Sequence, residues 1–190
     1  MNSENTKPQG PNFVADILFA KPQDENVNFE EKDLVELFPY GLSLANDASR
    51  PFMILKDKFN ELTLPVPINQ LEAGVTLTQS AHALEPVTTH RFTERLLESL
   101  DIKLERCVFV EIKGIHQYAR IYMKGHSQYQ SLKFRADEIM SLCVLLKVPI
   151  FATLNFINRS KLMSAEIVTL AQIASAQNPQ GIVKTHAYLM

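Results

Sequence analysis

The sequence lacks most of the residues that mark well-known catalytic loops and covalent cross-links. It has no tryptophan, two cysteines, and six glycines that stand singly among 190 residues. Without a glycine-rich loop to cradle phosphates, dinucleotide-binding and P-loop proteins are excluded, and no nucleotide cofactor is expected. The serine-hydrolase elbow and the H-E-x-x-H zinc motif are missing as well. Cys107 and Cys143 lie in apolar runs, which predicts buried, reduced thiols rather than a disulfide framework or a zinc site.

Long hydrophobic runs are also missing. One of the longest, residues 148–154, stops far short of the roughly 20 apolar residues that span a bilayer. The first residues have neither the basic region nor the apolar region of a signal peptide. We therefore expect a cytoplasmic protein without a membrane partner.

Neither sign of charge predominates, because the chain has 19 basic and 21 acidic residues and a net charge of −2. The first 50 residues hold nine acidic and four basic residues, a net −5, which leaves +3 for the rest. That surplus is smaller than in a dedicated nucleic-acid binder, whose domain pI typically exceeds ~9. Seven cations of the second half could line one face of a sheet or alternate between both faces: Lys103, Arg106, Lys113, Arg120, Lys124, Lys133 and Arg135.

Hydrophobic periodicity predicts an α+β fold, with a mixed, largely antiparallel sheet packed by about three helices and an extra C-terminal helix. Residues 1–32 are interpreted as a flexible acidic N-terminal extension, 33–157 as the main domain, and 158–190 as a C-terminal helix and tail. Segment 13–20 could be a short strand or helix, and the tail could include a partner-binding strand. The expected strands are 34–44, 52–56, 62–68, 104–112, 118–124, 129–134 and 148–151, with a turn at 46–49.

Four helices are predicted, beginning after Asn69, at Thr88 or Thr89, at Arg135 and at Met163. The second of them has a single apolar stripe, which we expect to face the core: Phe92, Leu96, Leu97 and Leu100. Two prolines in segment 62–68 confine that strand to a sheet edge or to its final residues.

Polar residues at the starts of these helices are the candidates for chemistry, because side chains there can project from a rigid scaffold into a cleft. Glu72 lies in a first helical turn, where it either complements the helix dipole or binds a metal. Residues 88–91, Thr-Thr-His-Arg, gather the groups that an anion or phosphate site requires. The alternative for them is a threonine cap beside a solvated histidine.

The third candidate is the strand-to-helix junction at residues 133–138, Lys-Phe-Arg-Ala-Asp-Glu. Arg135 offers a fork-shaped phosphate donor, and Asp137 and Glu138 could hold a divalent cation. The same two carboxylates could instead be an acidic pair of the first helical turn, with Arg135 as their salt-bridge partner.

These segments, in this order, resemble the bifunctional nuclease domain family. The match runs through residues 33–153, and Lys133 and Arg91 stand where the family has acids. The matching segments are Leu64-Pro65-Val66-Pro67-Ile68-Asn69 before Glu72-Ala73, Thr89-His90-Arg91-Phe92 after Pro86, Tyr118-Ala119, residues 133–140, and Val148-Pro149-Ile150.

The resemblance implies a self-associating domain, expected as a dimer, that cleaves DNA or RNA phosphodiesters. It implies catalytic roles for Glu72, His90 and Glu138 and substrate binding by Thr89, Arg91 and Arg135. A divalent cation, Mg²⁺ or Mn²⁺, on Glu72, Asp137 and Glu138 would activate water. The rival hypothesis is a non-catalytic, oligomeric ligand- or protein-binding module of the same fold. A third hypothesis is a regulatory protein that uses the acidic N-terminal arm.

Overall fold

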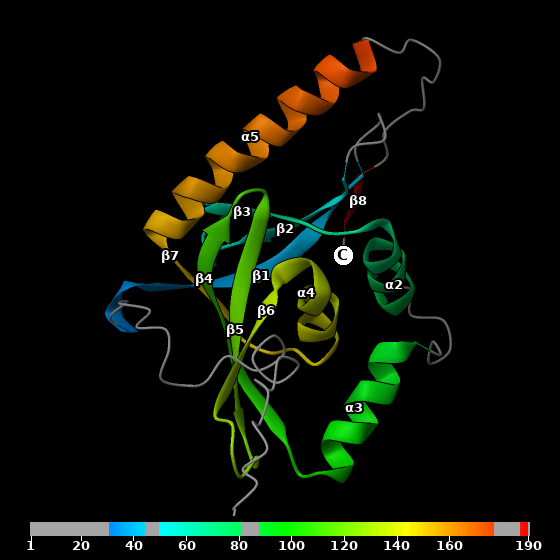
Figure 1. Cartoon of the computed structure of the whole chain (residues 1–190), viewed down its shortest axis with the longest axis vertical. Coiled ribbons are helices and arrows are strands. Elements are labelled where there is room, and N and C mark those ends of the chain that lie inside the picture. Colours follow the sequence, from blue (N-terminus) through cyan, green and yellow to red (C-terminus); the bar gives the residue numbers. More distant parts are fainter. Residues whose placement is uncertain (1–30, 45–49, 81–87, 177–186, 190) are drawn as a thin grey trace, which may run out of the picture.

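The computed structural model describes residues 31–44, 50–80, 88–176 and 187–189. Segment 13–20 and the turn predicted at 46–49 lie outside these residues. The strands form one mixed sheet in the order β3-β2-β1-β7-β4-β5-β6, with β8 paired to β1 (Figure 1). The strands are β1 Leu34–Ser43, β2 Phe52–Lys56, β3 Thr63–Pro67, β4 Lys103–Lys113, β5 His116–Lys124, β6 Ser131–Arg135, β7 Ile150–Thr153 and β8 Ala187–Leu189.

Strand pairing confirms a mixed, largely antiparallel sheet. Only β4 and β7 run parallel among the described strand pairs. β3 is an edge strand, as its two prolines predicted, because proline cannot donate to a ladder on both sides. The C-terminal β8 pairs with β1 of its own chain.

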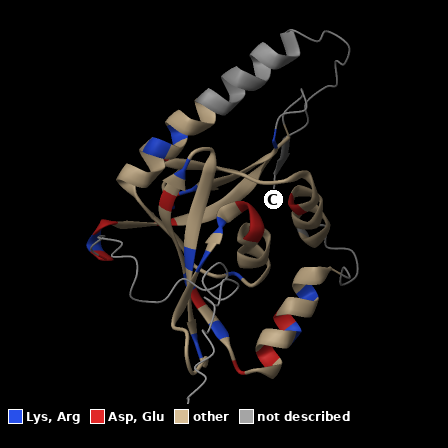
Figure 2. Ribbon diagram, viewed as in Figure 1, with Lys and Arg blue, Asp and Glu red and all other residues tan. Residues whose placement is uncertain are grey.

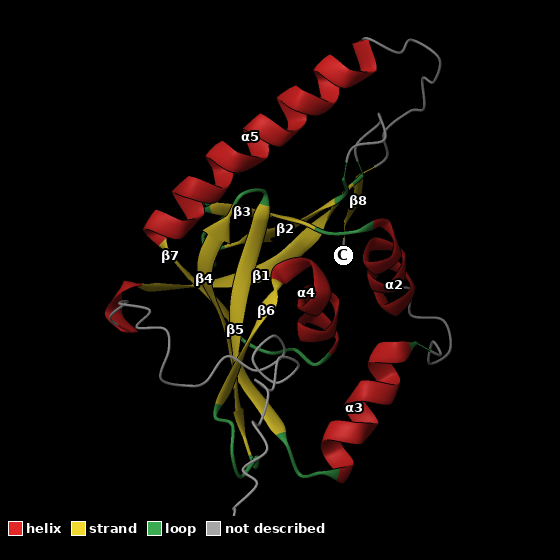
Figure 3. Ribbon diagram, in the orientation of Figure 1, coloured by secondary structure: helices red, strands yellow, loops and turns green. Residues whose placement is uncertain are grey.

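Four α-helices accompany the sheet in the described part of the chain, together with the 3₁₀-helix η1, Glu31–Asp33 (Figure 3). The predicted α+β fold is thereby confirmed. No described helix is long and apolar enough to cross a membrane. The α-helices are α2 Gln70–Ser80, α3 Thr89–Ser99, α4 Ala136–Leu145 and α5 Leu154–Ala176.

Short polar side chains set where the helices begin. The side-chain oxygen of Asn69 accepts from the backbone N–H of Glu72 at 2.8 Å and caps α2. Thr88 caps α3 in the same way, as predicted. The last helix begins at Leu154 rather than at Met163, because Thr153 at the end of β7 caps it directly.

The core lies between α4, the start of α5 and one face of the sheet. On the sheet side it contains Cys107, Phe109, Ala119 and Ile121, and on α4 it contains residues such as Met140. Fully burying a large aliphatic side chain stabilises a fold by about 1.5–3 kcal/mol, so this cluster holds the sheet and helices together. Both cysteines are buried and free, as predicted.

The apolar stripe on α3 does not face the core, contrary to the prediction. Phe92, Leu96 and Leu100 are exposed, at 69%, 45% and 57% of their surface. The helix stands away from the sheet and packs against α4 instead (Figure 1). Amphipathic spacing shows that a helix has an apolar side but not which neighbour that side meets. Here three of the four residues are exposed to solvent, and Leu97 is partly buried.

Candidate functional site

Asp137, in the first turn of α4, is bound by two guanidiniums. Nη2 of Arg50 lies 2.8 Å from Oδ2, and Arg135 binds both carboxylate oxygens, with 2.9 Å between Nε and Oδ1. Asp137 is buried, whereas the two arginine side chains are about one third exposed. The hydrogen bond to Asp137 raises the pKa of Arg135, so its guanidinium stays charged. Two cationic groups thus reach solvent at this end of α4.

A second polar cluster, of Glu72, His90 and Ser141, joins three helices one turn further along α4. The Ser141 hydroxyl donates to the carboxylate of Glu72. Nε2 of His90 lies 3.3 Å from Oε2 of the same carboxylate, and both side chains are nearly buried. This nitrogen has no partner in hydrogen-bonding geometry among the described residues. Nδ1 of His90 lies 3.4 Å from Oγ1 of Thr89.

The two clusters lie side by side because Asp137 and Ser141 are four residues apart on α4. Side chains at this spacing share one face of a helix, with Cβ atoms about 5–6 Å apart. The two clusters are therefore neighbours along one face of α4, where Asp137 binds the two guanidiniums and Ser141 binds Glu72. Such a set can bind a phosphate and exchange a proton beside it.

Several of the residues predicted from the sequence meet here, and two lie elsewhere. Arg91 binds Glu94, with 2.7 Å between Nη1 and Oε2. Glu138 points to solvent, with 57% of its side chain exposed and its Oε1 3.9 Å from Nε of Arg135. The catalytic role implied for Glu138 and the substrate-binding role implied for Arg91 stay predictions, and neither side chain has a contact with His90 among these ion pairs.

Sequence reasoning missed Arg50 and Ser141. Ser141 follows Asp137 at helical spacing, so the spacing on α4 was a usable signal. Arg50 is separated from Asp137 by 87 positions in the chain, and no local pattern marks it.

The predicted metal ligands are not assembled. The described residues contain no group of three or more His, Cys, Asp or Glu side chains that could hold a metal ion. Two guanidiniums already compensate the charge of Asp137, and Glu138 is turned to solvent. The set of Glu72, Asp137 and Glu138 therefore does not fit a shared cation in this arrangement.

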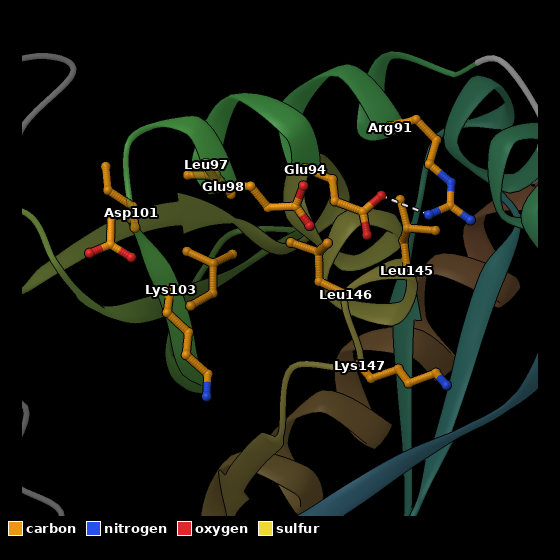
Figure 4. A pocket seen from close by; sticks show the side chains of 11 residues that line it. Arg91, Glu94, Leu97, Glu98, Asp101, Lys103, Leu145, Leu146 and Lys147 are labelled. Atoms are coloured by element: carbon orange, nitrogen blue, oxygen red, sulfur yellow. Dashed lines mark hydrogen bonds and ion pairs between the residues drawn. The ribbon is translucent and has the colours of Figure 1, made fainter.

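A cavity of about 720 Å³ lies between α3, the start of β4 and the end of α4 (Figure 4). Glu94 and Glu98 of α3 border it on one side, and Lys103 and Lys147 lie across from them. Leu97, Leu145 and Leu146 supply apolar lining. The residues that line the cavity include neither His90 nor Asp137.

Comparison with protein families identifies the family of this chain. The family model for the bifunctional nuclease domain matches residues 53–165, from β2 to the first half of α5. The chain belongs to the bifunctional nuclease domain family. No match was found among curated proteins. Membership in this family indicates a nuclease-like or nucleic-acid-related function.

Proposed function

We propose that the protein is a nuclease that hydrolyses phosphodiesters of DNA or RNA at the cluster of Glu72, His90 and Ser141. The observation that supports this most is the meeting of Glu72 and His90, from separate helices, in a nearly buried position. Asp137, with its two guanidiniums, lies one turn of α4 from Ser141, which binds Glu72. Family membership supports the same class of substrate.

His90 is suited to act as the general base. A neutral imidazole can take a proton from a water molecule as that water attacks phosphorus, and the P–O bond to the leaving oxygen then breaks. The adjacent carboxylate of Glu72 stabilises the imidazolium that forms, and Ser141 holds that carboxylate in place. General-base catalysis of this kind typically contributes about 10²–10⁴-fold to a rate.

Arg50 and Arg135 are suited to bind the phosphate. Each guanidinium has five N–H donors in a fork that matches phosphate oxygens, more than Asp137 engages. Preorganised cations also stabilise the charge that develops on the phosphoryl oxygens in the transition state. Mg²⁺ or Mn²⁺ stays a predicted cofactor without assigned ligands, and no step above depends on it.

Cleavage of labelled single- and double-stranded DNA and RNA, with Mg²⁺, Mn²⁺ or EDTA, tests this proposal. We expect His90→Ala to lower the rate by about 10²–10⁴-fold and Glu72→Gln to lower it as well. Glu138→Gln is the matched control, because that carboxylate lies on the same helix but faces solvent. Cleavage by a folded His90→Ala protein at the wild-type rate would exclude this site.

A non-catalytic binding module of the same fold is the second candidate. The exposed apolar stripe of α3 favours it, because large apolar surfaces on a soluble domain often mark contacts with other proteins. If the protein is such a binding module, we expect it to cleave no oligonucleotide with Mg²⁺, Mn²⁺ or EDTA, and we expect it to self-associate.

A further inference from the structure

The strand register places seven of the cations that follow residue 50 on one face of β4, β5 and β6: Lys103, Arg106, Lys113, Arg120, Lys124, Lys133 and Arg135. Lys113 belongs to this face because it pairs with His116, which alternates with Tyr118 on β5. Residues directly opposite each other in a sheet project to the same face, and residues alternate along a strand. Tyr118, Arg120, Tyr122 and Lys124 alternate along β5. Their partners across the register are Glu111, Val108, Arg106 and Lys103 on β4, and Arg135, Lys133 and Ser131 on β6.

We call this set of side chains the basic face. The opposite side of the same strands contains Cys107, Phe109, Ala119 and Ile121, which pack into the core. Lysine and arginine residues are distributed along β4, β5 and β6 in Figure 2. The face is therefore rich in cations even though the whole chain has a net charge of −2. Arg120 at its centre is buried and donates to Ser131, and Lys133 is nearly buried against Glu111, so the accessible cations are Lys103, Arg106, Lys113, Lys124 and Arg135.

Two tyrosines are interleaved with these cations. The Arg106 guanidinium lies 4.5 Å from the centre of the Tyr122 ring. The ammonium groups of Lys133 and Lys113 lie 5.4 and 5.8 Å from the centre of the Tyr118 ring. The two rings are four residues apart on one strand, a separation of about 13 Å.

Lys103 and Lys124 face each other directly at the end of the β4–β5 hairpin that is remote from its turn. Like charges at directly opposite positions destabilise a sheet. Both lysines are exposed. A bound anion would remove the repulsion between them, which makes this pair a natural contact for phosphate.

We propose that the basic face binds single-stranded nucleic acid. Its accessible cations, which surround the buried Arg120, would contact phosphates, and unpaired bases would stack on Tyr118 and Tyr122. Stacking on these rings requires bases that are not already stacked in a duplex, so single strands are preferred. This inference rests on the proposed function and names the form of its substrate.

Arg135 connects the basic face with the candidate site. It is the last residue of β6, opposite Tyr118 in the register, and its guanidinium binds Asp137 on α4. A strand that lies on the basic face therefore reaches Arg135, whose partner Asp137 lies one turn of α4 from Ser141 of the candidate site.

The test is a titration of a fluorescent oligo(dT) strand with the full chain carrying His90→Ala, which separates binding from cleavage. We expect Tyr122→Ala to weaken binding by roughly 5- to 150-fold, the usual effect of removing one stacking platform. Lys103→Ala with Lys124→Ala should lower the slope of log K against log salt by about 1.4, or ~0.7 per phosphate contact. Arg159→Ala with Lys161→Ala is the matched control, because it removes two exposed cations from α5.

The proposal would be overturned if the control pair weakened oligo(dT) binding as much as the basic-face variants do. It would also be overturned if oligo(dT) did not bind, or if a duplex bound more tightly. Equally tight binding of an abasic strand or of polyglutamate would overturn it as well, because this would indicate a general anion surface. The proposed nuclease activity can fail independently of the proposed binding surface. If oligo(dT) binding depends on the basic face but the wild-type protein cleaves no substrate, the nuclease activity is refuted and the binding surface is supported. Cleavage with a KM that the basic-face variants leave unchanged refutes only the surface.

Discussion

Asp137 shows how one residue can join distant parts of the chain. Its buried carboxylate neutralises Arg50, which precedes β2, and Arg135, which ends β6. Removing one member of a buried ion pair usually costs more than the pair itself contributes, because the remaining charge loses its partner. The two guanidiniums are partly solvated, which reduces that cost here.

We expect Asp137→Asn to lower the free energy of unfolding by about 1–3 kcal/mol, since the two guanidiniums would repel each other without the carboxylate. Urea unfolding measures this change. Glu138→Gln on the same helical turn should stay within about 0.5 kcal/mol, because that side chain is exposed. Similar decreases in the free energy of unfolding of both variants would show that the ion pairs of Asp137 do not stabilise the fold in this way.

At the scale of elements, Gly125 determines how the loop after β5 passes the loop before β4. Its φ of +96° is rarely adopted by residues with a side chain. A Cβ atom at this position would lie 2.0 Å from the backbone oxygen of Asp101. Glycine is therefore required at position 125 for two reasons: its backbone adopts this positive φ, and a side chain would clash with Asp101.

Gly125→Ala should destabilise the protein by about 2–4 kcal/mol through strain and the clash with Asp101. Gly74 offers a matched control, because it lies within α2 and a Cβ there meets nothing within 4 Å. Gly74→Ala should raise stability by about 0.5–1 kcal/mol. Thermal unfolding of both variants measures the contrast, and a decrease of similar size in both would contradict it.

The exposed stripe of α3 contributes little to folding of the single chain. Phe92→Ser with Leu96→Ser should therefore change the free energy of unfolding by less than about 1 kcal/mol, far less than core truncations. Sedimentation velocity then tests the second candidate function, which expects the wild type to self-associate and this variant to dissociate. Arg95→Ser on the same helix is the control and should leave association unchanged.

At the scale of the whole molecule, the two thiols lie between the sheet and α4 at the centre of the core. A hydrogen bond with Cys143, together with burial, raises the pKa of Cys107 well above its usual value. Because the thiolate is the reactive form, neither thiol should react with a disulfide reagent such as DTNB in the native protein.

We expect thiol labelling to require global unfolding, so that its rate in increasing urea follows the fraction of unfolded protein. Both thiols should then react together. Rapid labelling of one thiol in native buffer would show a local opening between β4 and α4 and contradict a single cooperative core.

Much of the local structure was predictable because it depends on neighbours in the chain. Hydrophobic periodicity identified β1 to β7 and the helices α2 to α4, whereas α5 begins nine residues before the predicted start. The two prolines of β3 indicated a place at the edge or at the strand's final residues, and β3 is an edge strand. Helix starts also indicated Glu72, His90 and Arg135 as site residues. Arg50 could not be found in this way, since its contact with Asp137 depends on how the sheet folds.

The sequence by itself determined the α+β class, the cap of α3 and the excess of cations after residue 50. Only the tertiary structure decided that α3 exposes its stripe and that the seven cations share one face. Two β-bulges in β4, between Leu104 and Arg106 and between Phe109 and Glu111, shift the alternation by one residue each. Counting along the strand would therefore put Lys103 and Arg106 on opposite faces, whereas pairing with β5 puts them on the same one.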